Sequence, residues 1–170
     1  MKKYILLVLT IPLFFIQCKK SEPTSFDTKA LDDKVKTTQG ETLTVKEMLN
    51  NYKGEIVLID IWASWCGDCL HSLPTVKFLK EKYGAQVTFL YSSMDKDKEA
   101  WHKALEKYDI KGEHYYLGSE WKTNFLTSIE LNWIPRFMIL GKDGSIKLYN
   151  AKKADDPKIE RILEKEIANN

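Results

Sequence analysis

The pattern of apolar and polar residues predicts alternating strands and helices over most of the chain. A nearly unbroken apolar run, Ile56 to Trp62, is rich in branched side chains and predicts a strand buried on both faces. A helix is predicted from about Cys66 to Tyr83, followed by a strand at 87–92 and a helix at 97–108. This alternation is typical of parallel strands joined by crossover helices, so the predicted class is α/β.

Smaller elements are predicted before this unit. Weak alternation over 34–38, Gly40 and a second short run at 42–45 predict a hairpin. Thr44 precedes Glu47 by three residues, which is the spacing of a capping box and predicts a short helix after the hairpin.

The second half of the chain predicts five further elements. A short strand is expected at 115–117 and a helix at 121–129. A strand at 137–140 is expected to turn back through Lys142-Asp143-Gly144 and pair with 146–149. Pro157 then opens an amphipathic helix with its apolar residues on one face.

The first 17 residues read as an export signal. Lys2 and Lys3 precede an apolar run over 4–16, which is shorter than the roughly 20 residues that span a bilayer. The run ends at Gln17-Cys18, with no small-residue cleavage site. Cys18 there resembles the lipobox cysteine of bacterial lipoproteins, although Gln17 stands where that family prefers a small residue.

The lipoprotein resemblance implies three segments. Residues 1–17 would be the signal peptide, 18–30 the lipidated cysteine with a flexible tether, and 31–170 the folded domain. Cleavage would remove two lysines and no acidic residue, so the net charge of +2 would fall to zero. The 170 residues, 44% hydrophobic and 29% charged, exclude a disordered chain, and the near balance of 26 basic and 24 acidic residues argues against a nucleic-acid partner.

Two cysteines stand where the buried strand leads into the predicted helix. Cys66 and Cys69, two residues apart at a helix start, can close a disulfide, and unpaired backbone N–H groups there favour a thiolate at Cys66. Cys66 is therefore the predicted nucleophile and Cys69 the resolving thiol. A purely structural disulfide is an alternative. Zinc is disfavoured because no second ligand pair exists, and haem attachment because Leu70 separates Cys69 from His71, so no metal is predicted. No diffusible cofactor is predicted either, because the cysteine pair itself would carry the two electrons.

The stretch Ile59-Asp60-Ile61-Trp62-Ala63-Ser64-Trp65-Cys66-Gly67-Asp68-Cys69 resembles the active-site segment of thioredoxins, and Ile134-Pro135 resembles their cis-proline loop. With the lipoprotein-like start, the chain is most similar to the membrane-anchored TlpA/ResA group of thiol-disulfide oxidoreductases. The resemblance implies a thioredoxin-like fold: a central mixed β-sheet flanked by helices, with an N-terminal hairpin extension and a central insertion.

The resemblance also implies roles for single residues. Asp60 would assist proton transfer at Cys69, which would explain a carboxylate inside an apolar strand; a strand-end Asp bonded to the backbone is the alternative. Trp65, Ile134 and Pro135 would contact the substrate, with the Ile134 backbone pairing with an extended segment. Pro135 would be a cis proline, the alternative being a trans proline that starts a strand.

Two residues depart from the family pattern. Asp68 stands between the cysteines, where its charge should oppose the Cys66 thiolate and make the pair more reducing. Arg136 stands where the family commonly has Thr, and it is expected either to stabilise the thiolate or to bind an acidic partner.

The predicted protein is an exported disulfide reductase that acts on disulfide-containing envelope proteins, is tethered to a membrane through its lipid, and is recharged by a membrane dithiol donor. Two other classes remain open at this stage. A peroxiredoxin-like thiol peroxidase would use Cys66 on peroxide, and an envelope copper chaperone would use both thiols as soft ligands.

Overall fold

The structure is a computed structural model that describes residues 21–169; the predicted signal peptide and Cys18 lie outside the described residues. In this described part of the chain, seven strands form one sheet: β1 (Lys34–Thr37), β2 (Thr42–Thr44), β3 (Ile56–Trp62), β4 (Val87–Ser93), β5 (Glu113–Tyr116), β6 (Arg136–Leu140) and β7 (Ile146–Ala151). The helices are α1 (Thr28–Leu31), α2 (Val45–Asn50), α3 (Gly67–Tyr83), α4 (Lys98–Lys107), α5 (Asn124–Ser128) and α6 (Pro157–Ala168).

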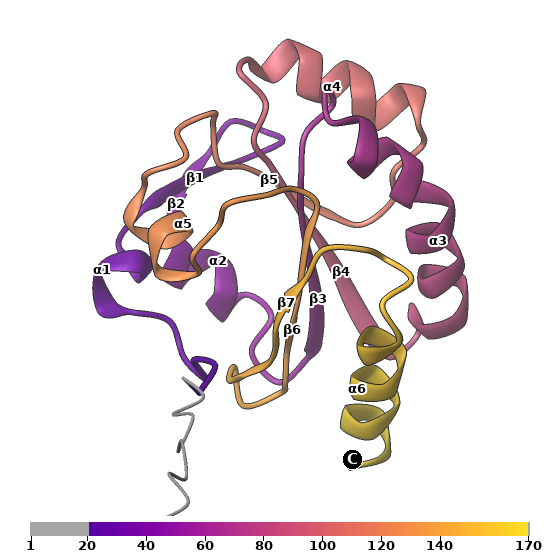
Figure 1. Ribbon diagram of the computed structural model, residues 1–170. Helices are drawn as coiled ribbons and strands as arrows, with labels where there is room; N and C mark the ends of the chain where they lie inside the picture. Colours follow the sequence, from indigo (N-terminus) through magenta and orange to yellow (C-terminus); the bar gives the residue numbers. More distant parts are fainter. Residues whose placement is uncertain (1–20, 170) are drawn as a thin grey trace, which may run out of the picture.

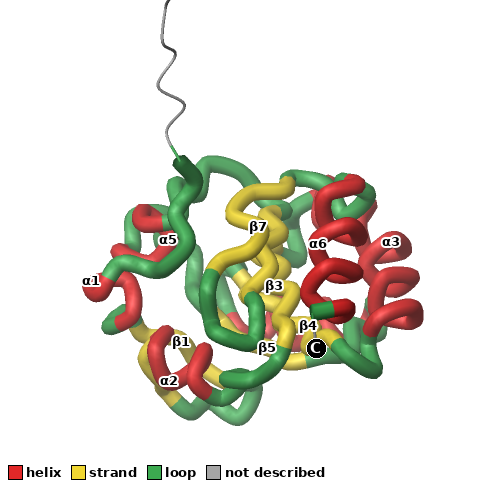
Figure 2. The backbone as a smooth tube through the Cα atoms, turned by 90° about the horizontal axis from the view of Figure 1, so that it is seen from below, coloured by secondary structure: helices red, strands yellow, loops and turns green. Residues whose placement is uncertain are grey.

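The sheet is mixed, in the order β2-β1-β5-β4-β3-β6-β7. At its centre, β3 pairs parallel with β4 and antiparallel with β6. The helices α3 and α6 lie together on one side of the sheet, and α1, α2 and α5 gather on the other (Figures 1 and 2). The predicted α/β class and the thioredoxin-like mixed sheet are confirmed.

The two predicted additions extend one edge of the sheet. The N-terminal hairpin β1–β2 joins through β1, which pairs antiparallel with β5. The inserted segment contributes α4 and β5, and β5 pairs parallel with β4. Every residue of β3 is buried, as its unbroken apolar run predicts, so this strand forms the rigid base from which the dithiol turn leaves.

Three parts of the chain differ from the sequence-based expectation. The strand expected at 115–117 begins earlier, at Glu113. The helix expected over 121–129 is only α5, because the Thr123 side chain accepts from the Leu126 amide and caps the helix there. The described part of the tether is folded: Phe26 packs on Phe125 with ring centroids 5.7 Å apart, and α1 begins at Thr28. Apolar contact at Phe26 thus orders a segment that has no apolar periodicity.

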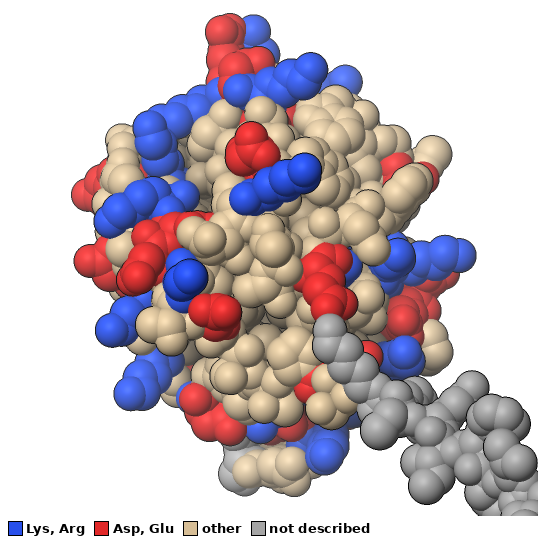
Figure 3. Space-filling view, turned by 60° about the vertical axis from the view of Figure 1, so that its left-hand side comes forward, with Lys and Arg blue, Asp and Glu red and all other residues tan. Residues whose placement is uncertain are grey.

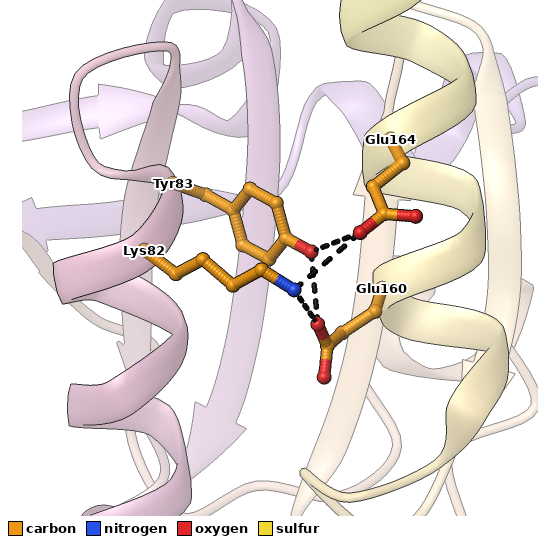
Figure 4. Close-up of polar contacts among 4 residues, drawn as sticks. All are labelled: Lys82, Tyr83, Glu160 and Glu164. Carbon is orange, nitrogen blue, oxygen red and sulfur yellow. Dashed lines mark hydrogen bonds and ion pairs between the residues drawn. The ribbon is translucent and has the colours of Figure 1, made fainter.

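A polar cluster joins the end of α3 to α6 (Figure 4). The Tyr83 hydroxyl donates to Glu160 at 2.9 Å and lies 2.8 Å from Glu164, and the Lys82 ammonium contacts both carboxylates. Burial is the main cause that raises the pKa of Tyr83 to about 12. Because α3 begins at the dithiol, this cluster fixes the far end of the helix that carries the site.

Basic and acidic side chains are interspersed on the face seen in Figure 3, in keeping with the balanced composition. Within residues 21–169, none of the helices combines the length and apolar character needed to cross a bilayer.

Candidate active site

The dithiol lies at the N-terminus of α3. Cys66 is the N-cap residue, with extended backbone angles, and its sulfur accepts a hydrogen bond from the Cys69 amide at 3.1 Å. Cys66 and Cys69 are joined as a disulfide, and both are largely buried. A sulfur in the N-cap position receives one of the N–H groups that a helix start leaves unpaired, which is the environment that stabilises a thiolate.

The turn that leads into α3 is closed by its own backbone. The Cys66 amide donates to the Ala63 carbonyl at 3.1 Å, so the four residues from Ala63 to Cys66 form a tight turn between β3 and α3. Trp65, inside the turn, is 55% exposed, so its indole stands on the surface immediately before Cys66. The predicted contact residue Trp65 is thus accessible to another molecule.

A second loop faces the dithiol. The Ile134–Pro135 peptide bond is cis, as the resemblance implies. The Ile134 carbonyl oxygen lies 3.6 Å from the Cys66 sulfur, although 68 residues separate the two in the chain. Since β6 pairs with β3 through Arg136 and Ile61, the sheet itself brings this loop beside the turn. Cys66, Ile134 and Pro135 therefore form one site.

Asp60 is buried in β3, opposite Tyr91 of β4 and Phe137 of β6. Its Oδ1 atom has no hydrogen-bond partner among the residues that the structure describes. Loss of hydration raises the pKa of Asp60 to about 8, because a buried carboxylate without a partner resists ionisation. The alternative of a strand-end Asp bonded to the backbone finds no support at Oδ1, because no backbone group of residues 21–169 bonds to that atom. A buried carboxyl with this pKa can exchange a proton near neutral pH.

The expectation that Arg136 reaches the substrate surface or the thiolate is wrong. Its side chain is buried, and its guanidinium donates to the carbonyl of Ile129 at 2.9 Å and to that of Glu130 at 3.4 Å. Burial lowers the pKa of Arg136. The Ile129 and Glu130 carbonyls follow α5, where helical carbonyls lack partners, so the two terminal nitrogens of the guanidinium are bound inside the fold.

A groove beside the dithiol brings residues that the sequence patterns did not single out together with Asp68. It has a volume of about 450 Å³ and is lined by Asp68 and His71 of α3, by Trp133 and by Lys152 and Lys153 after β7. Trp133 is 52% exposed and directly precedes Ile134. From sequence, Trp133 and His71 read only as packing or surface residues, because nothing in the local pattern shows that the β7–α6 loop comes beside α3.

Within residues 21–169, no three His, Cys, Asp or Glu side chains gather closely enough to hold a metal ion.

Residues 54–146, more than half of the chain, match the family model described as thioredoxin-like. The chain therefore belongs to the thioredoxin-like family.

Similarity to individual proteins agrees with this. The chain is 31% identical over 85 residues to the thioredoxin-like protein YneN of Bacillus subtilis, which covers 48% of each protein. It is 41% identical over 44 residues to a thioredoxin of Coprinus comatus, covering 26% of this chain and 41% of the relative. The chain thus spans about half, or less, of the length of the curated relatives that it matches.

Two solved structures extend the likeness over most of the fold. A candidate thiol-disulfide oxidoreductase of Bacteroides vulgatus is 32% identical with a TM-score of 0.69, over 84% of this chain and 91% of that one. A candidate thiol:disulfide interchange protein DsbE of Chlorobium tepidum has a TM-score of 0.66 over 86% and 98%, and at 20% identity it shows the fold alone. Fold, dithiol and relatives place the chain among the thioredoxin-like thiol-disulfide oxidoreductases.

Proposed function

We propose that the protein is an exported, lipid-anchored thiol-disulfide oxidoreductase of the TlpA/ResA type that reduces disulfides in other envelope proteins. The proposal rests mainly on one observation. The Cys66 sulfur accepts a hydrogen bond from the Cys69 amide at the start of α3. It also lies 3.6 Å from the carbonyl oxygen of Ile134, the residue before a cis proline. A substrate strand that pairs with the Ile134 backbone would bring its own disulfide to Cys66.

The reduction proceeds through two exchanges. The Cys66 thiolate attacks one sulfur of the substrate disulfide; that disulfide breaks, a mixed disulfide with Cys66 forms, and the first substrate thiolate takes up a proton. Cys69 then gives its proton to the Asp60 carboxylate and attacks the Cys66 sulfur. The second substrate thiolate leaves and is protonated, and the protein is left with the Cys66–Cys69 disulfide. Two electrons have passed to the substrate.

The charges around the dithiol support the reducing direction. Asp68 lies in the first turn of α3 between the cysteines, and the Arg136 guanidinium is bound to carbonyls elsewhere. Negative charge beside a thiolate destabilises the reduced form, which makes a couple more reducing.

The cellular setting follows from the N-terminal segment, which lies outside the described residues. Export through residues 1–17 and lipidation at Cys18 would place the domain at a membrane facing the cell envelope, where a membrane dithiol donor would reduce Cys66–Cys69 again. Replacing Cys18 by Ala should move the protein from the membrane fraction to the soluble fraction. Retention of the Cys18→Ala variant in the membrane would remove the lipid anchor from the proposal.

Reduction of insulin disulfides by dithiothreitol tests the activity. The wild type should accelerate the reaction, and Cys66→Ser should abolish the acceleration. In cells, Cys69→Ser should accumulate mixed disulfides with its substrates because the resolving thiol is missing. Peroxide consumption without insulin reduction would favour the peroxidase, and copper binding without turnover would favour the chaperone.

A further inference from the structure

A second buried carboxylate, which the proposed reaction does not use, holds the turn that carries the nucleophile. Asp95 follows β4 and is fully buried. Its Oδ1 atom accepts from the Ser64 amide at 3.0 Å and from the Ser64 hydroxyl at 2.6 Å. Asp95 lies 31 residues from Ser64 along the chain, and Ser64 lies two residues before Cys66.

The other oxygen of Asp95 is also bound. Oδ2 accepts from the Ser93 hydroxyl at 2.7 Å, and that hydroxyl in turn accepts from the Asp95 amide at 3.1 Å. The Met94 amide also donates to the Trp62 carbonyl at 2.8 Å. This bond joins the residue after β4 to the last residue of β3. The Asp95 carboxylate thus accepts hydrogen bonds from Ser64 and from Ser93.

We propose that Asp95 is a positioning residue for the dithiol: it locks the Ala63–Cys66 turn to the end of β4, and its buried charge opposes the Cys66 thiolate and keeps the couple reducing. The first effect follows from the hydrogen bonds to Ser64, and the second from the place of the charge at the turn that ends in Cys66. Ser64 is the first residue inside the turn, so fixing both its amide and its hydroxyl fixes the directions in which Trp65 and Cys66 leave the turn. A charge in a buried site is poorly screened, so it acts on a nearby thiolate more strongly than a surface acid does.

The proposal concerns the dithiol of the proposed function and is tested without a protein substrate. The full-length protein is equilibrated with glutathione: two glutathione thiols and the Cys66–Cys69 disulfide give glutathione disulfide and the dithiol. Asp95→Asn suits this test because the amide oxygen can still accept from Ser64 while its NH₂ group donates to Ser93. Loss of the charge should shift the equilibrium about tenfold toward the reduced protein, or about 30 mV.

Asp97→Asn is the matched control. Asp97 is also an acid after β4, but it is exposed and its carboxylate accepts from the Ala100 amide as the N-cap of α4. This variant removes one negative charge without touching the turn, so its equilibrium with glutathione should equal that of the wild type. A shift for Asp95→Asn no larger than that for Asp97→Asn would overturn the proposal.

A second variant decides the question if Asp95→Asn does not fold. Ser64→Ala removes the shortest donor to Asp95, so more of the carboxylate charge acts on Cys66 and the equilibrium should move toward the oxidised protein, opposite to Asp95→Asn. A merely structural clamp predicts a lower melting temperature with no change in the equilibrium, and that result for Ser64→Ala would also overturn the proposal. Absence of insulin reduction by the wild type would sink the proposed function but leave this measurement decisive.

Discussion

The Thr24 carbonyl accepts a hydrogen bond from the Ile146 amide at 2.8 Å. Ile146 begins β7 opposite Leu140, and Leu140 pairs with Val57 near the start of β3, whereas the dithiol follows the other end of β3. The described N-terminus is therefore attached at the end of the sheet opposite the dithiol (Figure 1). A domain held to a membrane through this segment would present Cys66 away from it.

We expect this N-terminal segment to contribute to stability. Phe26 is partly buried against Phe125, so Phe26→Ala should lower the free energy of unfolding by about 1–2 kcal/mol. Urea unfolding of the oxidised protein measures the change. Phe78→Ala, which removes an aromatic ring that is 54% exposed, is the control and should cost little. Equal losses in the two variants would mean that the Phe26 contact does not stabilise the domain.

Asp60 should make stability depend on pH. Its folded pKa, raised to about 8 by burial, lies above the ordinary value, so the folded state binds a proton that the unfolded state has released. The contribution of Asp60 to the free energy of unfolding is complete below about pH 4 and should be lost as the pH rises toward 8. Asp60→Asn lacks this titration and should be more stable than the wild type at pH 9 by roughly 3 kcal/mol or more.

Unfolding of the oxidised wild type and Asp60→Asn between pH 4 and 9 provides the measurement, because disulfide-bonded cysteines do not titrate in this form. Parallel stability curves for the two proteins would contradict the raised pKa of Asp60. In the proposed reaction the same variant should prolong the lifetime of the mixed disulfide, since Cys69 loses its proton acceptor.

Arg136 should act on stability and not on the thiol. Arg136→Thr leaves the Ile129 and Glu130 carbonyls without their donor, so the free energy of unfolding should fall by about 2–3 kcal/mol. The pKa of Cys66, followed by alkylation rate against pH in the reduced protein, should stay unchanged. A changed Cys66 pKa with unchanged stability would show instead that the guanidinium acts at the dithiol.

The cluster between α3 and α6 should stabilise the packing of the two helices. Tyr83→Phe removes the hydroxyl that contacts Glu160 and Glu164 and should cost about 1 kcal/mol. Thermal unfolding measures this loss. Tyr108→Phe, which changes a tyrosine hydroxyl outside this cluster, serves as the comparison, and a loss of the same size there would mean that the cluster contributes nothing specific.

Local patterns were enough to predict the elements that have strong signals. Three such signals each depend on only a few neighbouring residues: the apolar run of β3, the capping box of Thr44 and Glu47, and the proline that opens α6. The helix expected at 121–129 was overestimated, because Thr123 caps α5 later than the apolar residues indicate. The packing of Phe26 was missed because its partner, Phe125, lies 99 residues away.

Residue types at short spacing were sufficient to predict the α/β class, the Cys66–Cys69 motif and the burial of Asp60, and the resemblance of the active-site segment implied the thioredoxin-like fold. Three relationships became visible only in the folded chain: Arg136 binds carbonyls behind the site, Trp133 and Lys152 share a groove with Asp68, and Ser64 donates to Asp95. The physical reason is the sheet: pairing β3 with β4 and β6 brings the ends of distant segments together, and no local pattern specifies which side chains then meet.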